Sequence, residues 1–534
     1  MTIRDPARPP MSRRDLISLI GAAAGGTAAY QAMTSLGFAA PSPYRGPIRL
    51  EGDPKGASVV VLGAGLAGMT AAIELRRAGY RVRILEYNAR AGGRNWSIRG
   101  GDAYVELGGA TQICGFDDGH YLNPGPWRIP YHHHALLDYC RRFGVALEPF
   151  VQLNHNAYLH GKTAFGGVPQ RIRAVKADFD GATAELLAKA TRQGALDAAV
   201  SREDQEILLE ALRGLGGLDE DFRYRLGEES AQFRGYARDP GGGAEAAPAP
   251  GEPIGLHEIL ESRLWRGLRN FLDYDFQTTM FQPVGGMGRI GEAFARQLPD
   301  AIQFGAKVTA IRQDERGVAV AYRDLADGGA LRETKADWCV CTLPLSILGQ
   351  LPVAASPALK AAIDAVPYSS AVKIGLQFRR RFWEEDERIY GGISYTDLPI
   401  RQIGYPASGY NAGGKGVLLG AYVWGGPNAY ELTAMTPAER IAAALDDGAR
   451  IHPQYRAEFE TGVAVAWRRT PFILGCAGEW TEATRRDHYE NLCAIDGRIV
   501  LAGEHASYIP AWQEGAVLSA LDATMRLHRR VMAA

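Results

Sequence analysis

The sequence has few cysteines, and their spacing is not typical of a metal site or a disulfide framework. Six cysteines occur among 534 residues, and no two form a C-x-x-C pair. Cys339 and Cys341 lie in an apolar run, where a strand would place both on one face. His132, His133 and His134 are consecutive, so on a helix they point in different directions and cannot converge on one ion. We therefore expect buried thiols, no metal centre, and a helix that begins at the histidines.

An excess of charge of one sign and long hydrophobic runs are also lacking. The formal net charge is −1, and no polybasic tract follows the first few residues, which argues against a nucleic-acid surface. No segment reaches eighteen consecutive apolar residues, so no stable membrane span is expected. No Ser-His-Asp or paired-carboxylate arrangement stands out either. The partners are expected to be small molecules.

The N-terminal segment has the pattern of an export signal. Arg13 and Arg14 precede an Ala/Gly-rich stretch that reaches about residue 29, and a small-x-small pattern follows at 37–39. This order predicts a twin-arginine-type leader over residues 1–40 and a periplasmic or secreted protein. The alternatives are a leader that is never cleaved and a cytoplasmic protein.

The length exceeds what one hydrophobic core usually organises, so two or three domains are expected. Strand, glycine turn, helix and strand follow one another over 57–85, and strand-rich sequence returns at 307–311, 318–322 and 498–502 before a final helix from about Glu514. We expect an α/β fold with a discontinuous Rossmann-type nucleotide-binding domain (54–93, 284–366 and 495–534) and a mixed-sheet substrate-binding domain (94–150 and 367–494). Residues 151–283 predict a helical insertion, with a capped helix start at Ser201, helical spacing over 256–271, and a flexible loop at 239–253.

The glycine turn predicts dinucleotide binding. Gly63 permits the tight turn, Gly65 allows a pyrophosphate to approach the backbone, and Gly68 allows the helix and strand to pack closely. Glu86 ends the second strand at the spacing where a carboxylate accepts hydrogen bonds from the ribose hydroxyls.

Two further motifs, Ala91-Gly92-Gly93-Arg94 and Ala502-Gly503-Glu504, resemble those of the amine oxidase superfamily of flavoproteins. The resemblance implies FAD as the cofactor. Gly93 and Arg94 would lie beside the pyrophosphate, Glu504 beside the ribityl chain, the Val308 backbone beside adenine and Trp467 against the flavin ring. The other residues expected to bind the cofactor are Trp127, Gly503, Gln513 and Ala516.

Within this superfamily the sequence is most similar to L-amino acid oxidases. Arg128 falls in the segment 125–130, whose arginine pairs with the substrate carboxylate in that family, and a planar guanidinium can bind a carboxylate through two hydrogen bonds. Lys373 matches a lysine that holds a water near flavin N5. Tyr422 and Trp512 match aromatic walls around the amine and Cα. Ala511, Trp424 and Ala477 complete the expected substrate-binding residues, whereas Arg128, Lys373, Tyr422 and Trp512 are the expected catalytic residues.

The resemblance implies oxidative deamination of L-amino acids to 2-oxo acids, ammonia and hydrogen peroxide, by hydride transfer from Cα to flavin N5 with oxygen as the acceptor. A broad range favouring bulky apolar or aromatic side chains is expected, because basic substrates would require a carboxylate that the sequence does not place. The alternatives are a decarboxylating amino acid 2-monooxygenase, a monoamine oxidase and a non-catalytic flavin-binding scaffold. Cys476 lies where monoamine oxidases attach FAD, but the neighbouring tyrosine is missing, so non-covalent FAD is favoured. A homodimer or higher homo-oligomer is expected.

Overall fold

A six-stranded sheet joins three distant parts of the chain. The computed structural model describes residues 42–271, 273–276 and 279–533, so the predicted leader at 1–40 lies outside the described residues. The strand order is β14 (Ile302–Gln303), β2 (Arg81–Leu85), β1 (Ser58–Leu62), β18 (Trp338–Cys341), β25 (Ile499–Leu501) and β24 (Ile495–Asp496). All neighbours are parallel except β24, which pairs antiparallel with β25. The expected α/β fold with a discontinuous Rossmann-type unit is therefore confirmed.

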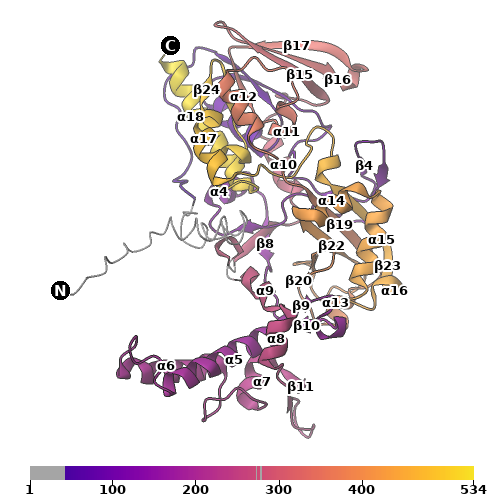
Figure 1. Ribbon diagram of the computed structural model, residues 1–534. Coiled ribbons are helices and arrows are strands. Elements are labelled where there is room, and N and C mark those ends of the chain that lie inside the picture. Colours follow the sequence, from indigo (N-terminus) through magenta and orange to yellow (C-terminus); the bar gives the residue numbers. More distant parts are fainter. Residues whose placement is uncertain (1–41, 272, 277–278, 534) are drawn as a thin grey trace, which may run out of the picture.

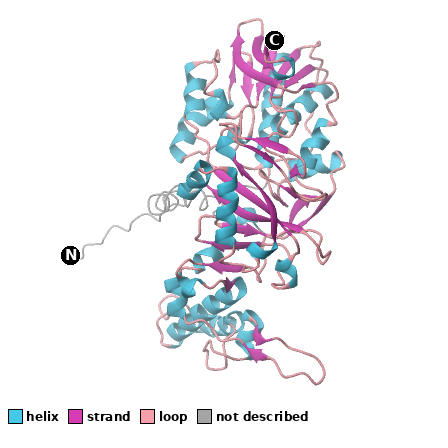
Figure 2. Ribbon diagram, turned by 90° about the vertical axis from the view of Figure 1, so that its right-hand side faces the viewer, coloured by secondary structure: helices cyan, strands magenta, loops and turns pink. Residues whose placement is uncertain are grey.

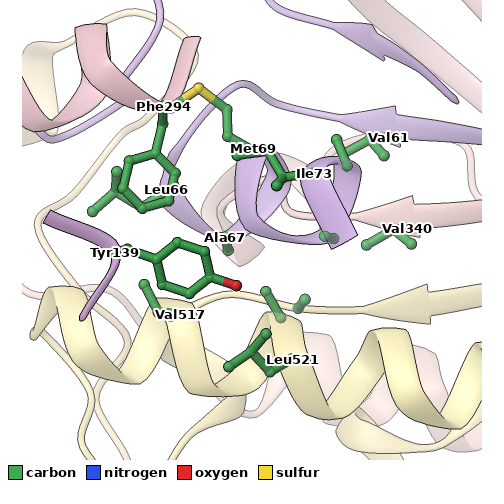
Figure 3. Close-up of a cluster of buried hydrophobic side chains, with 14 of the residues drawn as sticks. Val61, Leu66, Ala67, Met69, Ile73, Tyr139, Phe294, Val340, Val517 and Leu521 are labelled. Carbon is green, nitrogen blue, oxygen red and sulfur yellow. The ribbon is translucent and has the colours of Figure 1, made fainter. Parts of the chain in front are cut away.

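Both faces of this sheet are covered (Figures 1 and 2). Figure 3 shows one face, where Val61 and Val340 of the sheet meet Met69 and Ile73 of α3 (Leu66–Arg77) and Leu521 of α18 (Gln513–Met532). The opposite face packs against the antiparallel strands β15 (Ala306–Gln313), β16 (Val318–Asp324) and β17 (Ala330–Ala336) and against α11 (Leu345–Leu348), α12 (Pro357–Asp364) and α17 (Glu482–Cys493). Burial on both faces explains the continuous apolar runs of β1 and β18.

The predicted cysteine arrangement is confirmed. Cys339 and Cys341 are buried in the same hydrophobic cluster, whereas Val340 between them belongs to the cluster on the other face. All six cysteines are free thiols. The expectation of buried thiols holds for Cys114, Cys140, Cys339 and Cys341, whereas Cys476 and Cys493 are half-buried.

A seven-stranded mixed sheet forms a second layered unit below the first in Figure 1. Its order is β10 (Gln170–Arg171), β9 (Tyr158–His160), β20 (Ile393–Thr396), β21 (Gln402–Gly404), β22 (Gly416–Trp424), β19 (Ala371–Phe378) and β23 (Phe459–Ala466). Helices α14 (Gly426–Ala434) and α15 (Pro437–Gly448) cover one face, so every residue of β19 is buried. The short sheet β7 (Ile129–Pro130), β13 (Met280–Pro283) and β8 (Leu147–Phe150) lies beside it.

The remaining short elements connect these units. They are β3 (Ile98–Arg99), β4 (Ala103–Val105), β5 (Thr111–Ile113), β6 (Tyr121–Leu122), α10 (Gly288–Ala295), α13 (Phe382–Glu385), α16 (Tyr455–Glu458), and the 3-10 turns η1 (Ala164–Gly167), η3 (Tyr274–Phe276), η4 (Leu325–Asp327), η5 (Trp467–Arg469) and η6 (Glu504–Ala506).

Helix α4 (His134–Arg142) begins at the three histidines, as predicted. The Glu514 carboxylate, from the first turn of α18, accepts hydrogen bonds from the Ala135 and Leu136 amides at 2.9 and 2.7 Å. A carboxylate at a helix N-terminus satisfies free amides and matches the helix dipole. The cap fixes α4, and with it the segment that carries Arg128, against the start of α18.

Helices α5 (Ile172–Arg192), α6 (Arg202–Gly216), α7 (Glu228–Arg234), α8 (Leu256–Ser262) and α9 (Trp265–Leu268) form an arm at the bottom of Figure 1. The predicted cap is confirmed, because Ser201 Oγ accepts from the Asp204 amide at 3.1 Å. The continuous helix predicted over 256–271 is wrong: Arg263 takes a left-handed φ of 57°, which ends α8, and the chain continues as α9 and η2 (Arg269–Phe271). The loop between β11 (Tyr236–Arg238) and β12 (Ala249–Pro250) is exposed over 239–248, and its flexibility stays a prediction.

No helix within the described residues is long and apolar enough to cross a membrane. The same residues contain no group of three or more His, Cys, Asp or Glu side chains that could hold a metal ion.

Candidate active site

The glycine turn leaves one open position between two crowded ones. A Cβ on Gly68 would lie 2.0 Å from the Gly63 carbonyl oxygen, and Gly63 itself has a φ of 100° and donates to the Leu85 carbonyl at 2.8 Å. A Cβ on Gly65 would meet no protein atom within 4 Å. The close approach at Gly68 therefore serves packing, and the free space at Gly65 is available to a ligand.

The Glu86 carboxylate is hydrogen-bonded to the glycine turn. Its Oε2 accepts from the Ala64 amide at 2.7 Å, and its Oε1 accepts from the backbone and side-chain amides of Asn88. The Ala306 amide donates to the Glu86 carbonyl at 2.8 Å, so β15, which carries the buried Val308, passes beside this corner.

The second glycine motif lies against the first. The Gly92 amide donates to the Ala64 carbonyl at 2.8 Å, and a Cβ on Gly93 would lie 3.2 Å from the Gly65 Cα. Asn95, which the sequence analysis missed, is buried with neither side-chain amide atom bonded to a described residue. A buried amide without partners indicates a polar ligand or water.

Arg94, which is half-buried, and Glu504, which is buried, form an ion pair at 2.8 Å. Arg94 also donates to the Cys476 carbonyl at 2.6 Å, and Glu504 accepts from the Ala511 amide at 2.9 Å. Burial raises the pKa of Glu504, but the Arg94 guanidinium, His505 and the Ala511 amide together hold the pKa below its usual value. The pair thus stays ionised and joins the two motifs that the sequence analysis assigned to the cofactor.

Gly503, which precedes this carboxylate, has a φ of 147°. In the first turn of α18, Ala516 is half-buried, and Gln513 is buried with its Oε1 unbonded within the described chain.

Lys373 is fully buried in the middle of β19. Its Nζ donates to the Gly125 and Asn123 carbonyls at 2.6 and 3.3 Å and lies 4.5 Å from the centre of the Tyr422 ring. Burial, with the Arg128 guanidinium adding to it, lowers the pKa of Lys373 to about 7. Trp467 is buried nearby and donates from Nε1 to the Pro124 carbonyl at 2.8 Å, so it holds the same loop.

Arg128 is 9% exposed and faces aromatic rings on two sides. Its Cζ lies 4.5 Å from the Phe276 centroid and 5.4 Å from that of Trp127. Its Nε and Nη1 are buried and form no hydrogen bond with any described residue. Burial lowers the pKa of Arg128, although Tyr422, Tyr395 and Asp275 act in the opposite direction.

The aromatic side chains around this guanidinium are in contact with one another. Trp127 and Tyr422 meet edge to face at 6.1 Å, and Phe276 lies 6.2 Å from Trp512, which packs against His133 at 5.0 Å. The structure thus brings Arg128, Lys373, Tyr422 and Trp512 into one neighbourhood.

Three of the expected substrate-binding residues lie at its edges. Trp424 is 43% exposed at the end of β22, and Ala511 is exposed with a left-handed φ of 67°. Ala477 is buried, and its carbonyl accepts from the Ser369 amide at 2.9 Å.

Residues from the helical region and the neighbouring strands were missed by the sequence analysis. Phe276 and Asp275 belong to η3, Asp273 precedes it, Gln152 follows β8, and Tyr395 lies in β20. No local motif marks any of them, so no signal in the sequence could have identified them.

Comparison with known proteins gives the family. The sequence model for flavin containing amine oxidoreductases matches residues 66–528. The L-amino-acid oxidase of Siganus canaliculatus is 28% identical over 481 residues, covering 89% of this chain and 86% of that protein. The L-amino-acid oxidase of Bungarus fasciatus is 27% identical over 496 residues, covering 91% and 89%.

Solved structures share the fold at lower identity. The cyclohexylamine oxidase of Brevibacterium oxydans has a TM-score of 0.57 at 16% identity, covering 89% of this chain and 99% of that one. A putrescine oxidase bound to putrescine has a TM-score of 0.55 at 17% identity, covering 90% and 99%. Because the family match spans most of the chain, the protein belongs to the flavin-containing amine oxidoreductases and is a flavin-dependent enzyme.

Proposed function

We propose that this enzyme is an L-amino acid oxidase that converts its substrates to 2-oxo acids, ammonia and hydrogen peroxide. The observation that carries the proposal is that Arg128 Nε and Nη1 are buried and have no hydrogen-bond partner among the described residues. A buried cation without a counterion is costly, whereas a carboxylate can satisfy two of its donors at once. A substrate with an acid group beside the amine supplies that carboxylate, and a simple amine does not.

The described residues fit FAD as the cofactor. The open space at Gly65, at the N-terminus of α3, suits a pyrophosphate, and the Glu86 carboxylate suits ribose hydroxyls. The side-chain amide of Asn95 and Oε1 of Gln513, which have no hydrogen-bond partner among the described residues, offer further hydrogen bonds. We assign the other expected cofactor residues, Gly93, Arg94, Trp127, Val308, Trp467, Gly503, Glu504 and Ala516, to the same site. FAD would accept the hydride that leaves Cα and pass the electrons on to oxygen.

Non-covalent binding of FAD is favoured by the state of Cys476. Burial raises the pKa of its thiol to about 12, so the thiol stays protonated near neutral pH. Because the thiolate is the nucleophile in cysteine chemistry, a thiol that stays protonated is poorly suited to forming a covalent link.

The chain's own contribution is to orient the substrate. Arg128 would hold the α-carboxylate, while the rings of Tyr422 and Trp512 flank the amine and the Ala511 carbonyl accepts from it. Such orientation of a bound substrate lowers the barrier without a strong side-chain base. Lys373, with a pKa of about 7, can hold a water and exchange a proton with it near neutral pH. The aromatic walls can pack against the apolar part of a bulky substrate side chain.

The product distinguishes this proposal from its rivals. L-phenylalanine and phenethylamine differ only in the carboxylate, so the oxidase should turn over the first much faster and yield a 2-oxo acid, ammonia and peroxide. An amide product would identify a decarboxylating monooxygenase. Equal rates with both compounds would identify a monoamine oxidase. The structural neighbours are named a putrescine oxidase and a cyclohexylamine oxidase. A flavin that stays yellow when L-amino acids are added without oxygen would identify a scaffold.

We also propose the domain division and the export signal predicted from the sequence. Cleavage after about residue 40 in a host with a twin-arginine pathway, abolished by Arg13→Lys with Arg14→Lys, would support export. Light scattering of the purified protein would test the expected homo-oligomer.

A further inference from the structure

The structure places the carboxylate residue Asp273 near the proposed substrate site, where the sequence analysis placed no carboxylate. Asp273 directly precedes η3, and the Phe276 amide donates to its carbonyl at 2.9 Å, so the turn that presents Phe276 to Arg128 also fixes Asp273. Tyr395 is within electrostatic reach of both Arg128 and Asp273. Arg128, which would hold the α-carboxylate, and Asp273 therefore both lie near Tyr395.

Among the described residues, no cationic side chain forms an ion pair with Asp273. Asp275 is paired with His132 at 3.5 Å, whereas Asp273 has only the exposed Arg269 within electrostatic reach. Burial raises the pKa of Asp273, with the neighbouring Asp275 adding to the effect. A cation placed beside Asp273 would favour the ionised carboxylate and so offset both effects.

A second acceptor lies beside Tyr395. Gln152 is 5% exposed and is hydrogen-bonded to Tyr395 through its side chain, and its Oε1 is buried without a donor in the described chain. A buried acceptor without a donor indicates a ligand that brings one.

We propose that the site selects L-amino acids whose side chain ends in an ammonium or guanidinium group, which Asp273 and Gln152 Oε1 receive. The inference rests on the proposed function, because Arg128 must hold the α-carboxylate for the side chain to reach this end of the site. The aliphatic stem of such a substrate can pack along the rings of Phe276 and Trp512, as long cationic side chains do on apolar surfaces.

L-lysine and L-norleucine make a matched pair, because norleucine lacks only the terminal ammonium. We expect the wild-type kcat/KM for L-lysine to exceed that for L-norleucine by about tenfold or more, the contribution of one hydrogen bond to a charged group. Asp273→Asn should bring this ratio close to one while norleucine oxidation changes little. Asp327→Asn, in the exposed turn η4, should leave the ratio as in the wild type.

Inhibition by compounds that lack the α-amine provides the second readout. 6-Aminohexanoate and hexanoate lack the α-amine, so we expect an amino acid oxidase to bind them as inhibitors without oxidising them. The first should inhibit several-fold more strongly than the second, and both Asp273→Asn and Gln152→Leu should remove the difference. If Asp273→Asn does not fold with its flavin, Gln152→Leu carries the same test.

Equal kcat/KM for lysine and norleucine in the wild type, or a lysine preference that survives Asp273→Asn, would overturn the inference and leave the amino acid oxidase in place. Oxidation of cadaverine and hexylamine without oxidation of either amino acid would overturn the proposed function and this inference together.

Discussion

The guanidinium carbon of Arg128 lies 4.5 Å from the centroid of the Phe276 ring. The two residues are 148 positions apart in the sequence, and the ring comes from a 3-10 turn of the helical region. The ring packs against the guanidinium, whose Nε and Nη1 have no hydrogen-bond partner in the described part of the chain.

Arg128→Lys tests whether the shape of this cation matters. The substitution keeps the charge but loses the planar fork, so KM for L-amino acids should rise about tenfold or more while oxidation of the corresponding amines stays unchanged. Steady-state peroxide assays on both substrate types measure this. Arg498→Lys is the matched control, because Arg498 also lies over an aromatic ring, that of Trp338 at 4.8 Å, but outside the site. An unaltered KM in Arg128→Lys would refute the role of Arg128.

Gly65→Ala should impair flavin binding, whereas Gly68→Ala should impair the stability of the protein. An alanine at 68 would place Cβ 2.0 Å from the Gly63 carbonyl oxygen, so the helix must shift and thermal stability should fall even without cofactor. An alanine at 65 meets no protein atom within 4 Å, so the apoprotein should keep its stability but lose flavin. The flavin-to-protein absorbance ratio and the melting temperature of each apoprotein separate the two effects. Full flavin content in Gly65→Ala would place the pyrophosphate elsewhere.

Lys373→Met should stabilise the protein most at low pH. The pKa of Lys373 is about 7 in the folded protein against an ordinary value of 10.5. Below pH 7 both states are protonated, and the full cost of burying the charge is present. Between about pH 7 and 10.5 only the unfolded state binds the proton, so wild-type stability rises with pH and the advantage of the variant declines.

The stability gain of Lys373→Met is bounded by the difference in the proton affinity of Lys373 between the unfolded and the folded protein. Each tenfold change corresponds to about 1.4 kcal/mol, so the gain at pH 6 should be a few kcal/mol at most. Urea unfolding from pH 6 to pH 10 measures it, with the exposed Lys335→Met as a control that should show no such trend. If the difference in the free energy of unfolding between wild type and Lys373→Met does not change with pH, the charged form of Lys373 is not destabilised by burial.

Glu106→Gln should destabilise the second layered unit strongly. Glu106 pairs with Arg440, and both side chains are fully buried; Arg440 also donates to the Leu432 and Met435 carbonyls at the end of α14. Removing the acid leaves a buried cation unpaired, a change that typically costs about 3–5 kcal/mol. Chemical denaturation measures the loss. The exposed pair of Arg312 and Glu333 offers the contrast, because Glu333→Gln should cost about 1 kcal/mol or less.

The sequence alone determined the parts of this protein that local chemistry dictates. The alternation of apolar strand, glycine turn and helix over 57–85 predicted β1, α3 and β2, because a crowded turn admits only glycine and a strand buried on both faces must be apolar. The same reasoning placed the start of α4 and the cap at Ser201, where neighbours in the sequence are also neighbours in space.

Only the tertiary structure decided what surrounds Arg128. Phe276, Asp273 and Gln152 lie in segments without a motif, and their role depends on how the helical region folds back against β20 and β22. A charge or a ring gains its function from what it faces, and contacts across more than a hundred residues leave no trace in local periodicity. The glycine motif could therefore be interpreted from the chain, whereas the carboxylate near the substrate site became visible only after folding brought it there.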